Sequence, residues 1–125
     1  MEGENINDPT AFLDRVCSSI TGVKKAYISD VQGAILAESS GAQDDFSLTL
    51  VRSFPKYVDR LGKLSFGDAQ SMVVEGKGCS AVLLVSHPLF ITFLCSEKAN
   101  FALLREIPNE MKDFLAHLKT FVDTA

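Results

Sequence analysis

The segment from Ser71 to Ser96 constrains the fold most strongly, because it reads as three consecutive β-strands. We predict strands over Gln70–Glu75, Cys79–Val85 and Leu89–Cys95. Glycines in the first connection reach the positive φ angles of a tight turn, and Pro88 marks the second turn. The last two strands are apolar at nearly every position, so helices must cover both faces of the sheet.

Composition and charge limit the class of protein. The chain has 125 residues, of which 46% are hydrophobic and 22% charged, as expected for one globular domain. We expect a flexible lead over residues 1–7 and a single domain over residues 8–125. The net charge of −4 argues against a nucleic-acid partner, which would need a surplus of Lys and Arg.

The sequence also predicts how the chain relates to membranes. No apolar run approaches the ~20 residues of a membrane span, and no signal peptide opens the sequence. Glu2 stands where N-myristoylation requires glycine. We therefore expect a cytoplasmic protein without direct membrane insertion, whose attachment to any membrane is made through partners.

Three helices are predicted around the strands. Asp8 is a good N-cap, and an apolar stripe after Pro9 predicts a helix of about three turns. A middle helix is expected over Asp45–Leu64. A last helix is expected to begin after Asn100, with an irregular start and a regular course from Pro108 onwards.

A second group of strands precedes the middle helix. We predict strands over Val23–Ser29 and Ala34–Glu38, joined by a turn at Asp30–Gly33. Lys24 and Lys25 make this hairpin polar, as expected for an outer pair of strands. The order α-β-β-α-β-β-β-α then predicts an α+β fold with one five-stranded antiparallel sheet and helices on both faces.

The middle helix carries more apolar residues than one packing face needs. Pro55 lies inside it and is expected to bend or break it near residues 51–53. A helix that packs only on its own sheet needs a stripe about 100° wide. The apolar residues spread over more than half of the circumference; they are Phe46, Leu48, Leu50, Val51, Phe54, Tyr57, Val58, Leu61 and Leu64.

We find no catalytic, cofactor or metal site in the sequence. Gly76-Lys77-Gly78 lacks the spacing of a phosphate-binding loop, and a hairpin turn explains it. His87 and His117 have no Cys, Asp or Glu at the spacing of metal ligands. Asp44 and Asp45 are explained as helix caps. We therefore expect a protein that is not an enzyme.

The three cysteines, Cys17, Cys79 and Cys95, form no C-x-x-C pair. An odd number of cysteines in apolar surroundings is typical of buried, reduced thiols. We therefore interpret them as structural residues.

Two features point to a protein partner. The strand Gln70–Glu75 follows the crossing helix and should lie at a sheet edge, yet it has no proline and only one charge. The over-wide apolar belt of the middle helix lies next to it in the sequence. We predict that a related protein pairs with this strand to give a continuous sheet across two subunits. The interface residues that we predict are Leu50, Phe54, Tyr57, Val58, Leu61, Ser71, Val73 and Glu75.

Several short motifs in this order resemble the roadblock family, a group of small dynein light-chain and GTPase-regulator proteins. The first hairpin turn, Ser29–Gly33, is similar to the Ser-Asp-x-x-Gly turn of that family. The other matching stretches are Asp59–Leu64, Ser71–Val74, Pro88–Phe93 and Ala99–Asn100. Within the family, the likeness is to the scaffold subunits of Ragulator complexes that partner the kinase MEK.

The resemblance implies a roadblock/longin-like three-layer sandwich and a non-enzymatic adaptor. Such a subunit forms a heterodimer with a second roadblock-type subunit and joins the other Ragulator subunits on late endosomes and lysosomes. Its implied partners are Rag GTPases, in mTORC1 signalling, and the MEK and ERK kinases. Two alternatives stay open: a homodimeric regulator of a small GTPase, and a dynein light-chain-like cargo adaptor.

Overall fold

The computed structural model of the chain describes residues 8–41, 45–63, 71–76, 78–96 and 101–120, without the side chains of residues 46 and 61–63. The predicted N-terminal lead, Asp44, Gln70, Asn100 and the end of the last helix lie outside these residues. The elements are α1 (Pro9–Ser19), β1 (Val23–Ser29), β2 (Ile35–Glu38), α2 (Asp45–Lys63), β3 (Ser71–Gly76), β4 (Cys79–Ser86), β5 (Leu89–Cys95), α3 (Phe101–Leu104), α4 (Ile107–Glu110) and α5 (Lys112–Lys119).

The five strands form one antiparallel sheet in the order β2-β1-β5-β4-β3. Both predicted groups of strands are therefore present, and β1 joins them by pairing with β5. This arrangement leaves β2 and β3 at the two edges of the sheet. The predicted α+β fold with one five-stranded antiparallel sheet is confirmed.

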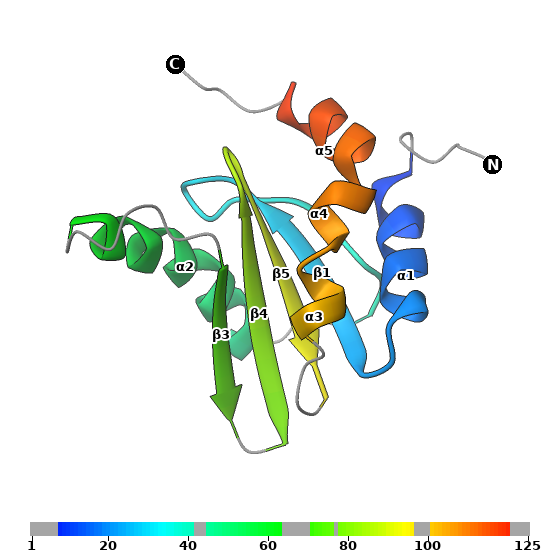
Figure 1. Ribbon diagram of the computed structural model, residues 1–125, viewed down its shortest axis with the longest axis horizontal. Helices are drawn as coiled ribbons and strands as arrows, with labels where there is room; N and C mark the ends of the chain where they lie inside the picture. Colours follow the sequence, from blue (N-terminus) through cyan, green and yellow to red (C-terminus); the bar gives the residue numbers. More distant parts are fainter. Residues whose placement is uncertain (1–7, 42–44, 64–70, 77, 97–100, 121–125) are drawn as a thin grey trace.

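Helices cover both faces of the sheet, as the continuous apolar strands predicted (Figure 1). Helix α2 lies on one face, and α1, α3, α4 and α5 lie on the other. The core beneath α2 includes Phe54, Ala81, Leu83 and Phe90. The larger core on the opposite face includes Leu13, Ile28, Phe93, Phe114 and Leu115. Successive residues of β4 and β5 alternate between the two cores, which explains why neither strand has a polar face.

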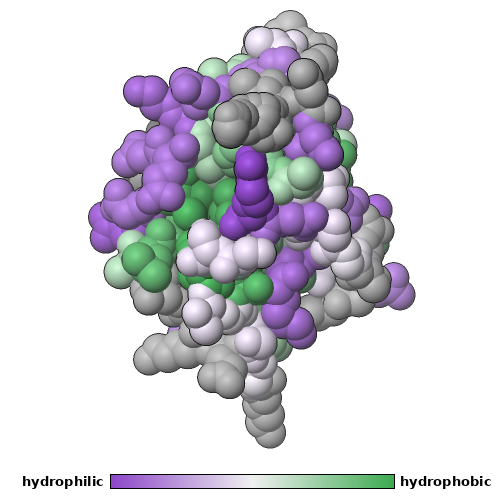
Figure 2. Space-filling view, turned by 90° about the vertical axis from the view of Figure 1, so that its right-hand side faces the viewer, coloured by the Kyte–Doolittle hydropathy of each residue, from purple (hydrophilic) through white to green (hydrophobic). Residues whose placement is uncertain are grey.

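The side of the molecule that carries α1 is mostly hydrophilic. Figure 2 shows this side, with a smaller hydrophobic area between hydrophilic side chains. Phe12 stacks on Phe114 with their ring centroids 4.3 Å apart, and Arg15 lies over the Phe12 ring. The stacked rings join α1 to α5 at the end of the larger core.

The first hairpin forms as predicted. Asp30 Oδ1 accepts hydrogen bonds from the backbone N–H groups of Gln32 and Ala34, at 2.9 and 3.0 Å. Gly33 has a φ of +85°, and its Cα lies against the backbone of Arg52 in α2. A Cβ at position 33 would lie 3.0 Å from Arg52 Cα, so glycine is needed there for space as well as for conformation.

Strands β1 and β2 form an outer pair at one end of the sheet, as predicted, with β1 between β2 and β5. Lys25 of β1 is buried, and its Nζ lies 3.1 Å from Glu38 Oε1. The same Nζ donates to the carbonyl oxygens of Ser39, at 2.6 Å, and Gly41, at 2.9 Å. A buried ammonium group is tolerated when such partners replace water. The polar residue therefore marks a connection to the next loop, and not exposure of the strand.

Helix α1 begins as predicted, because Asp8 Oδ1 accepts a hydrogen bond from the Ala11 N–H at 3.1 Å. Helix α2 runs without interruption through Pro55, so the predicted break is absent. Proline removes one backbone hydrogen bond, whereas burial of Val51 and Phe54, in the turn before Pro55, holds the helix on the sheet.

The last helix is more divided than expected. Its first turns are irregular, as predicted, but the regular helix starts at Lys112 and not at Pro108. Pro108 occupies the first turn of the short helix α4, where a missing N–H costs nothing. Met111 has φ −101° and ψ 15°, which separates α4 from α5. Ile107, Met111 and Phe114 all remain buried, so the apolar stripe continues across the break.

Candidate protein-binding interface

The edge strand β3 is the most open part of the sheet. Ser71, Val73, Val74 and Glu75 are exposed, and the exposed fraction is 42% for Val73 and 37% for Val74. Only one neighbour, β4, pairs with this strand. One side of its backbone therefore has no strand of the sheet to bond.

The register shows which backbone groups point outward. Gly76 pairs with Cys79 at the end of the hairpin, and the closing pair of such a tight hairpin exchanges hydrogen bonds. Hydrogen-bonded and non-hydrogen-bonded pairs alternate along an antiparallel ladder. It follows that Ser71, Val73 and Glu75 direct their N–H and C=O groups away from β4. These are the groups that a further strand would bind.

An apolar groove of about 450 Å³ separates β3 from α2. Tyr57 stands at its rim and is 46% exposed. Residues from both elements line the groove; they are Leu50, Phe54, Tyr57, Arg60, Met72 and Val74. Apolar side chains beside an unpaired strand edge indicate a surface that another protein can cover.

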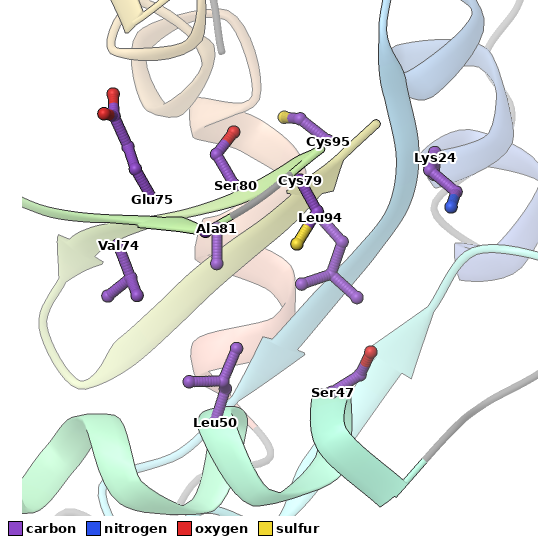
Figure 3. Close-up of a pocket in the computed structure, with 11 residues that line it drawn as sticks. Lys24, Ser47, Leu50, Val74, Glu75, Cys79, Ser80, Ala81, Leu94 and Cys95 are labelled. Carbon is purple, nitrogen blue, oxygen red and sulfur yellow. The ribbon is translucent and has the colours of Figure 1, made fainter. Parts of the chain in front are cut away.

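A second cavity, of about 410 Å³, continues this groove to the beginning of α2 (Figure 3). Leu50 and Val74 line both hollows. Val74, Ala81 and Leu94 point from the sheet towards α2, whereas Glu75 and Ser80 point to the opposite face. The lining is mainly apolar, so the cavity suits an apolar side chain of a partner better than a charged ligand.

The predicted interface residues of α2 fall into three groups. Leu50, Tyr57 and Val58 lie on α2 near or beneath the groove, and all three are at least partly accessible. Phe54 lines the groove from below but is fully buried in the core of this chain. The side chain of Leu61 lies outside the described residues.

The predicted residues of β3, which are Ser71, Val73 and Glu75, present their backbone outward. Their side chains lie on the face opposite α2, because their partners in β4 belong to that face. The sequence prediction did not include Met72 and Val74, whose side chains lie on the face of the sheet that α2 covers. The signal was present: both are apolar and two residues apart, whereas Ser71 and Glu75 on the alternate positions are polar.

The described residues contain no group of three or more His, Cys, Asp or Glu side chains that could hold a metal ion. Burial raises the pKa of the Cys17 and Cys95 thiols, which keeps them protonated at neutral pH. Cys79 is exposed at the start of β4, so the expectation that all three thiols are buried is wrong there. Cys79 is exposed because it lies next to the turn between β3 and β4.

Comparison with known families identifies the chain. Residues 7–122 match the model of the family described as "Mitogen-activated protein kinase kinase 1 interacting". The chain belongs to this family. The match includes every element of the fold, so membership applies to the whole described domain.

A curated relative supports the assignment. The chain is 23% identical over 122 residues to the "Ragulator complex protein LAMTOR3 homolog" of Drosophila melanogaster. The alignment covers 95% of this chain and 98% of the relative. The family and this relative both point to an adaptor that works by binding other proteins and not by catalysis.

Solved structures, among them a Roadblock/LC7 domain, share the fold. MglB of Myxococcus xanthus has a TM-score of 0.72 at 15% identity, with 95% of this chain and all of that chain covered. The gliding protein MglB of Thermus thermophilus has a TM-score of 0.71 at 13% identity, with 98% and 96% covered. A Roadblock/LC7 domain from Streptomyces avermitilis has a TM-score of 0.64 at 15% identity, with 86% and 91% covered. The predicted roadblock fold is therefore confirmed.

Within the part of the chain described, no helix has the length and apolar character to span a bilayer.

Proposed function

We propose that this chain is a non-enzymatic scaffold subunit that forms a heterodimer with a second roadblock-type subunit. The contact is made by strand β3 and the groove-facing side of α2. Outward backbone groups of Ser71, Val73 and Glu75 bond a strand of the partner, and Tyr57, Met72 and Val74 pack against its side chains. The exposed edge strand beside an apolar groove is the observation that carries this proposal.

Covering the strand edge and the groove together stabilises both parts of this surface. A bare strand edge exposes backbone donors and acceptors in a fixed row, which only another strand matches well. The neighbouring groove exposes apolar area that loses contact with water when a helix of the partner lies over it. A related fold supplies both a strand and a helix in the same relative position, so a roadblock-type partner suits this surface.

At the level of the cell, we propose that the heterodimer belongs to a Ragulator-like complex on late endosomes and lysosomes. There it supports Rag GTPase and mTORC1 signalling, and MEK–ERK signalling. The name of the Drosophila relative, a Ragulator complex protein, supports the first role, and the family's description supports an interaction with a MAP kinase kinase. In this proposal the chain is peripheral to the membrane and reaches it through the other subunits.

The test is the mass in solution, measured by light scattering, of the chain alone and mixed with a roadblock-type subunit from the same organism. We expect a mass near 13.6 kDa alone, or a weak dimer, and a tight one-to-one complex in the mixture. The cognate partner should also raise the temperature of unfolding, because it binds only the folded chain. A tight homodimer that ignores the partner would contradict the proposal and favour a homodimeric GTPase regulator or a light-chain-like adaptor.

A further inference from the structure

The outer face of α2 carries a line of basic residues that the proposed heterodimer does not explain. Arg52, Lys56 and Arg60 follow one another at intervals of four residues, and all three are exposed. Residues four apart lie on one face of a helix, so these side chains form a single row. We call this row the basic stripe. Val51 and Phe54, which are buried, face the sheet on the other side of the helix.

The charge of the stripe contrasts with that of the chain. Helix α2 contains four basic and two acidic residues, whereas the whole chain has a net charge of −4. The helix therefore carries +2 and the remaining residues carry −6. In the last helices, by contrast, exposed basic residues stand next to acidic ones: Arg105 precedes Glu106, and Lys112 precedes Asp113. Positive charge is concentrated on α2, where it creates a local positive potential.

The stripe is not neutralised from within the described part of the chain. None of the three basic side chains forms an ion pair with another described residue, whereas Asp59 of the same helix has an interaction of its own. Like charges four residues apart also repel one another and weaken a helix. The arrangement thus costs stability in the isolated chain, and an anionic group bound across the row would remove that cost.

We propose that the basic stripe is a docking surface for an acidic segment of another protein. Three cations on a rigid helix match carboxylates spaced along a helix or an extended peptide. Arg60 also lines the groove beside β3, so the stripe runs from that groove out to the solvent side of α2. This inference does not rest on the heterodimer, because all of its residues lie on one helix of this chain.

A protein partner fits better than a membrane or a nucleic acid. Membrane-surface helices combine basic residues with apolar residues that insert between lipids, but the positions beside the stripe include Thr49 and Ser53. Basic clusters that bind anionic lipids typically contain about four to eight Lys or Arg residues, whereas the stripe consists of Arg52, Lys56 and Arg60. An extended anionic membrane repels the whole chain at long range, because the chain has a net charge of −4. A short acidic segment is small enough to interact with the stripe alone.

The test uses the full chain labelled with ¹⁵N and a short poly-glutamate peptide as the probe, at low ionic strength. We expect amide shifts concentrated in the middle of α2. Arg52→Glu combined with Lys56→Glu should weaken peptide binding by about tenfold or more, measured by fluorescence anisotropy. Arg52→Gln with Lys56→Gln should give a smaller loss, which separates removal of charge from its reversal. Lys112→Glu, at an exposed site on α5, is the matched control and should bind as the unmodified chain does.

Circular dichroism establishes that each variant is folded before binding is compared. Shifts spread evenly over Arg105, Lys112 and α2 would overturn the proposal, as would unchanged binding by both double variants. Vesicles that contain phosphatidylserine form the third arm, and we expect no binding to them. Vesicle binding that the double variants abolish would assign the stripe to membranes and overturn its assignment to a protein.

Discussion

The two edges of the sheet are built in opposite ways. At one edge, β2 is short and side-chain contacts hold its end in place. Lys25 pairs with Glu38 and donates hydrogen bonds to the carbonyls of Ser39 and Gly41. Asp14 of α1 accepts two hydrogen bonds from Ser40. At the other edge, β3 has six residues, most of them exposed, and an apolar groove beside it.

We call the β2 edge the closed edge of the sheet and the β3 edge its open edge. Proteins avoid accidental strand pairing by shortening an edge strand or by placing charges and connections on it. The β2 edge has these features, and they connect three elements that are distant in sequence. The β3 edge lacks a charge between Ser71 and Val74. We infer that the first edge serves stability and the second serves binding, and variants at each edge test this division.

The largest effect is expected at Val73, whose N–H points away from β4. Val73→Pro removes this donor and should weaken binding of the roadblock-type partner by about 3 kcal/mol, more than about a hundredfold. Proline is tolerated at an outward position of an edge strand, so the stability of the free chain should change little. Isothermal titration calorimetry measures the binding. Val73→Thr keeps both the N–H and the branched shape, and it should bind normally.

A charge in the groove should have the next largest effect on binding. Val74→Asp places a carboxylate among Leu50, Tyr57 and Met72, and the partner would bury it without a counter-charge. We expect a loss of about 2 kcal/mol in binding, roughly thirtyfold. Val31→Asp is the control, because Val31 is a similarly exposed valine in the turn before β2. Equal losses from both variants would show that charge alone, and not the β3 edge, controls binding.

At the closed edge we expect loss of stability without loss of binding. Gly33→Ala strains a residue with φ +85° and pushes a Cβ to 3.0 Å from Arg52 Cα. It should lower the free energy of unfolding by about 2–3 kcal/mol in urea titrations. Gly78→Ala has a similar φ of +73° but open space around its Cβ, so it should cost only about 1 kcal/mol. Similar losses for the two variants would mean that contact with α2 contributes nothing.

The smallest effect concerns pH at the closed edge. Hydrogen bonds from the Ser40 hydroxyl and then from its N–H hold the pKa of Asp14 below its ordinary value of 3.8. A lowered pKa in the folded state stabilises the protein above the unfolded value, and this contribution is lost as the pH falls through the folded value. Asp14→Asn should therefore reduce the acid-induced loss of stability by a few tenths of a kcal/mol, because the site is near the surface. Urea unfolding between about pH 3 and pH 6 measures it. An unchanged pH profile would show that the Ser40 contact is unimportant.

Much of the fold was predictable from local signals. The bounds of β1 and β5 agree with the sequence prediction, because turn residues flank both strands and β-branched or aromatic residues fill them. Local signals were insufficient where tertiary packing decides. Burial of Val51 and Phe54 carries α2 through Pro55, and Lys25 is buried because Glu38 and a loop supply its partners. No local pattern reveals either compensation.

The candidate interface was predictable as a region but not residue by residue. The order of the elements places β3 at an edge, and the wide apolar belt marks α2. Deciding that Met72 and Val74, and not Ser71 and Val73, share a face with α2 requires knowing which side of the sheet the helix covers. The path of the chain across the sheet determines which face α2 covers. This path depends on several elements, so it cannot be read from the sequence of β3 or of α2 alone.

The most direct test of the open edge is hydrogen exchange of individual amides, measured by NMR in the free chain and in its complex with the roadblock-type partner. We predict that the amides of Ser71, Val73 and Glu75 exchange quickly in the free chain and become protected in the complex. Those of Met72 and Val74 should be protected in both states, because they bond β4. Protection that appears instead at β2, or nowhere on β3, would contradict the claim that β3 is the edge that binds.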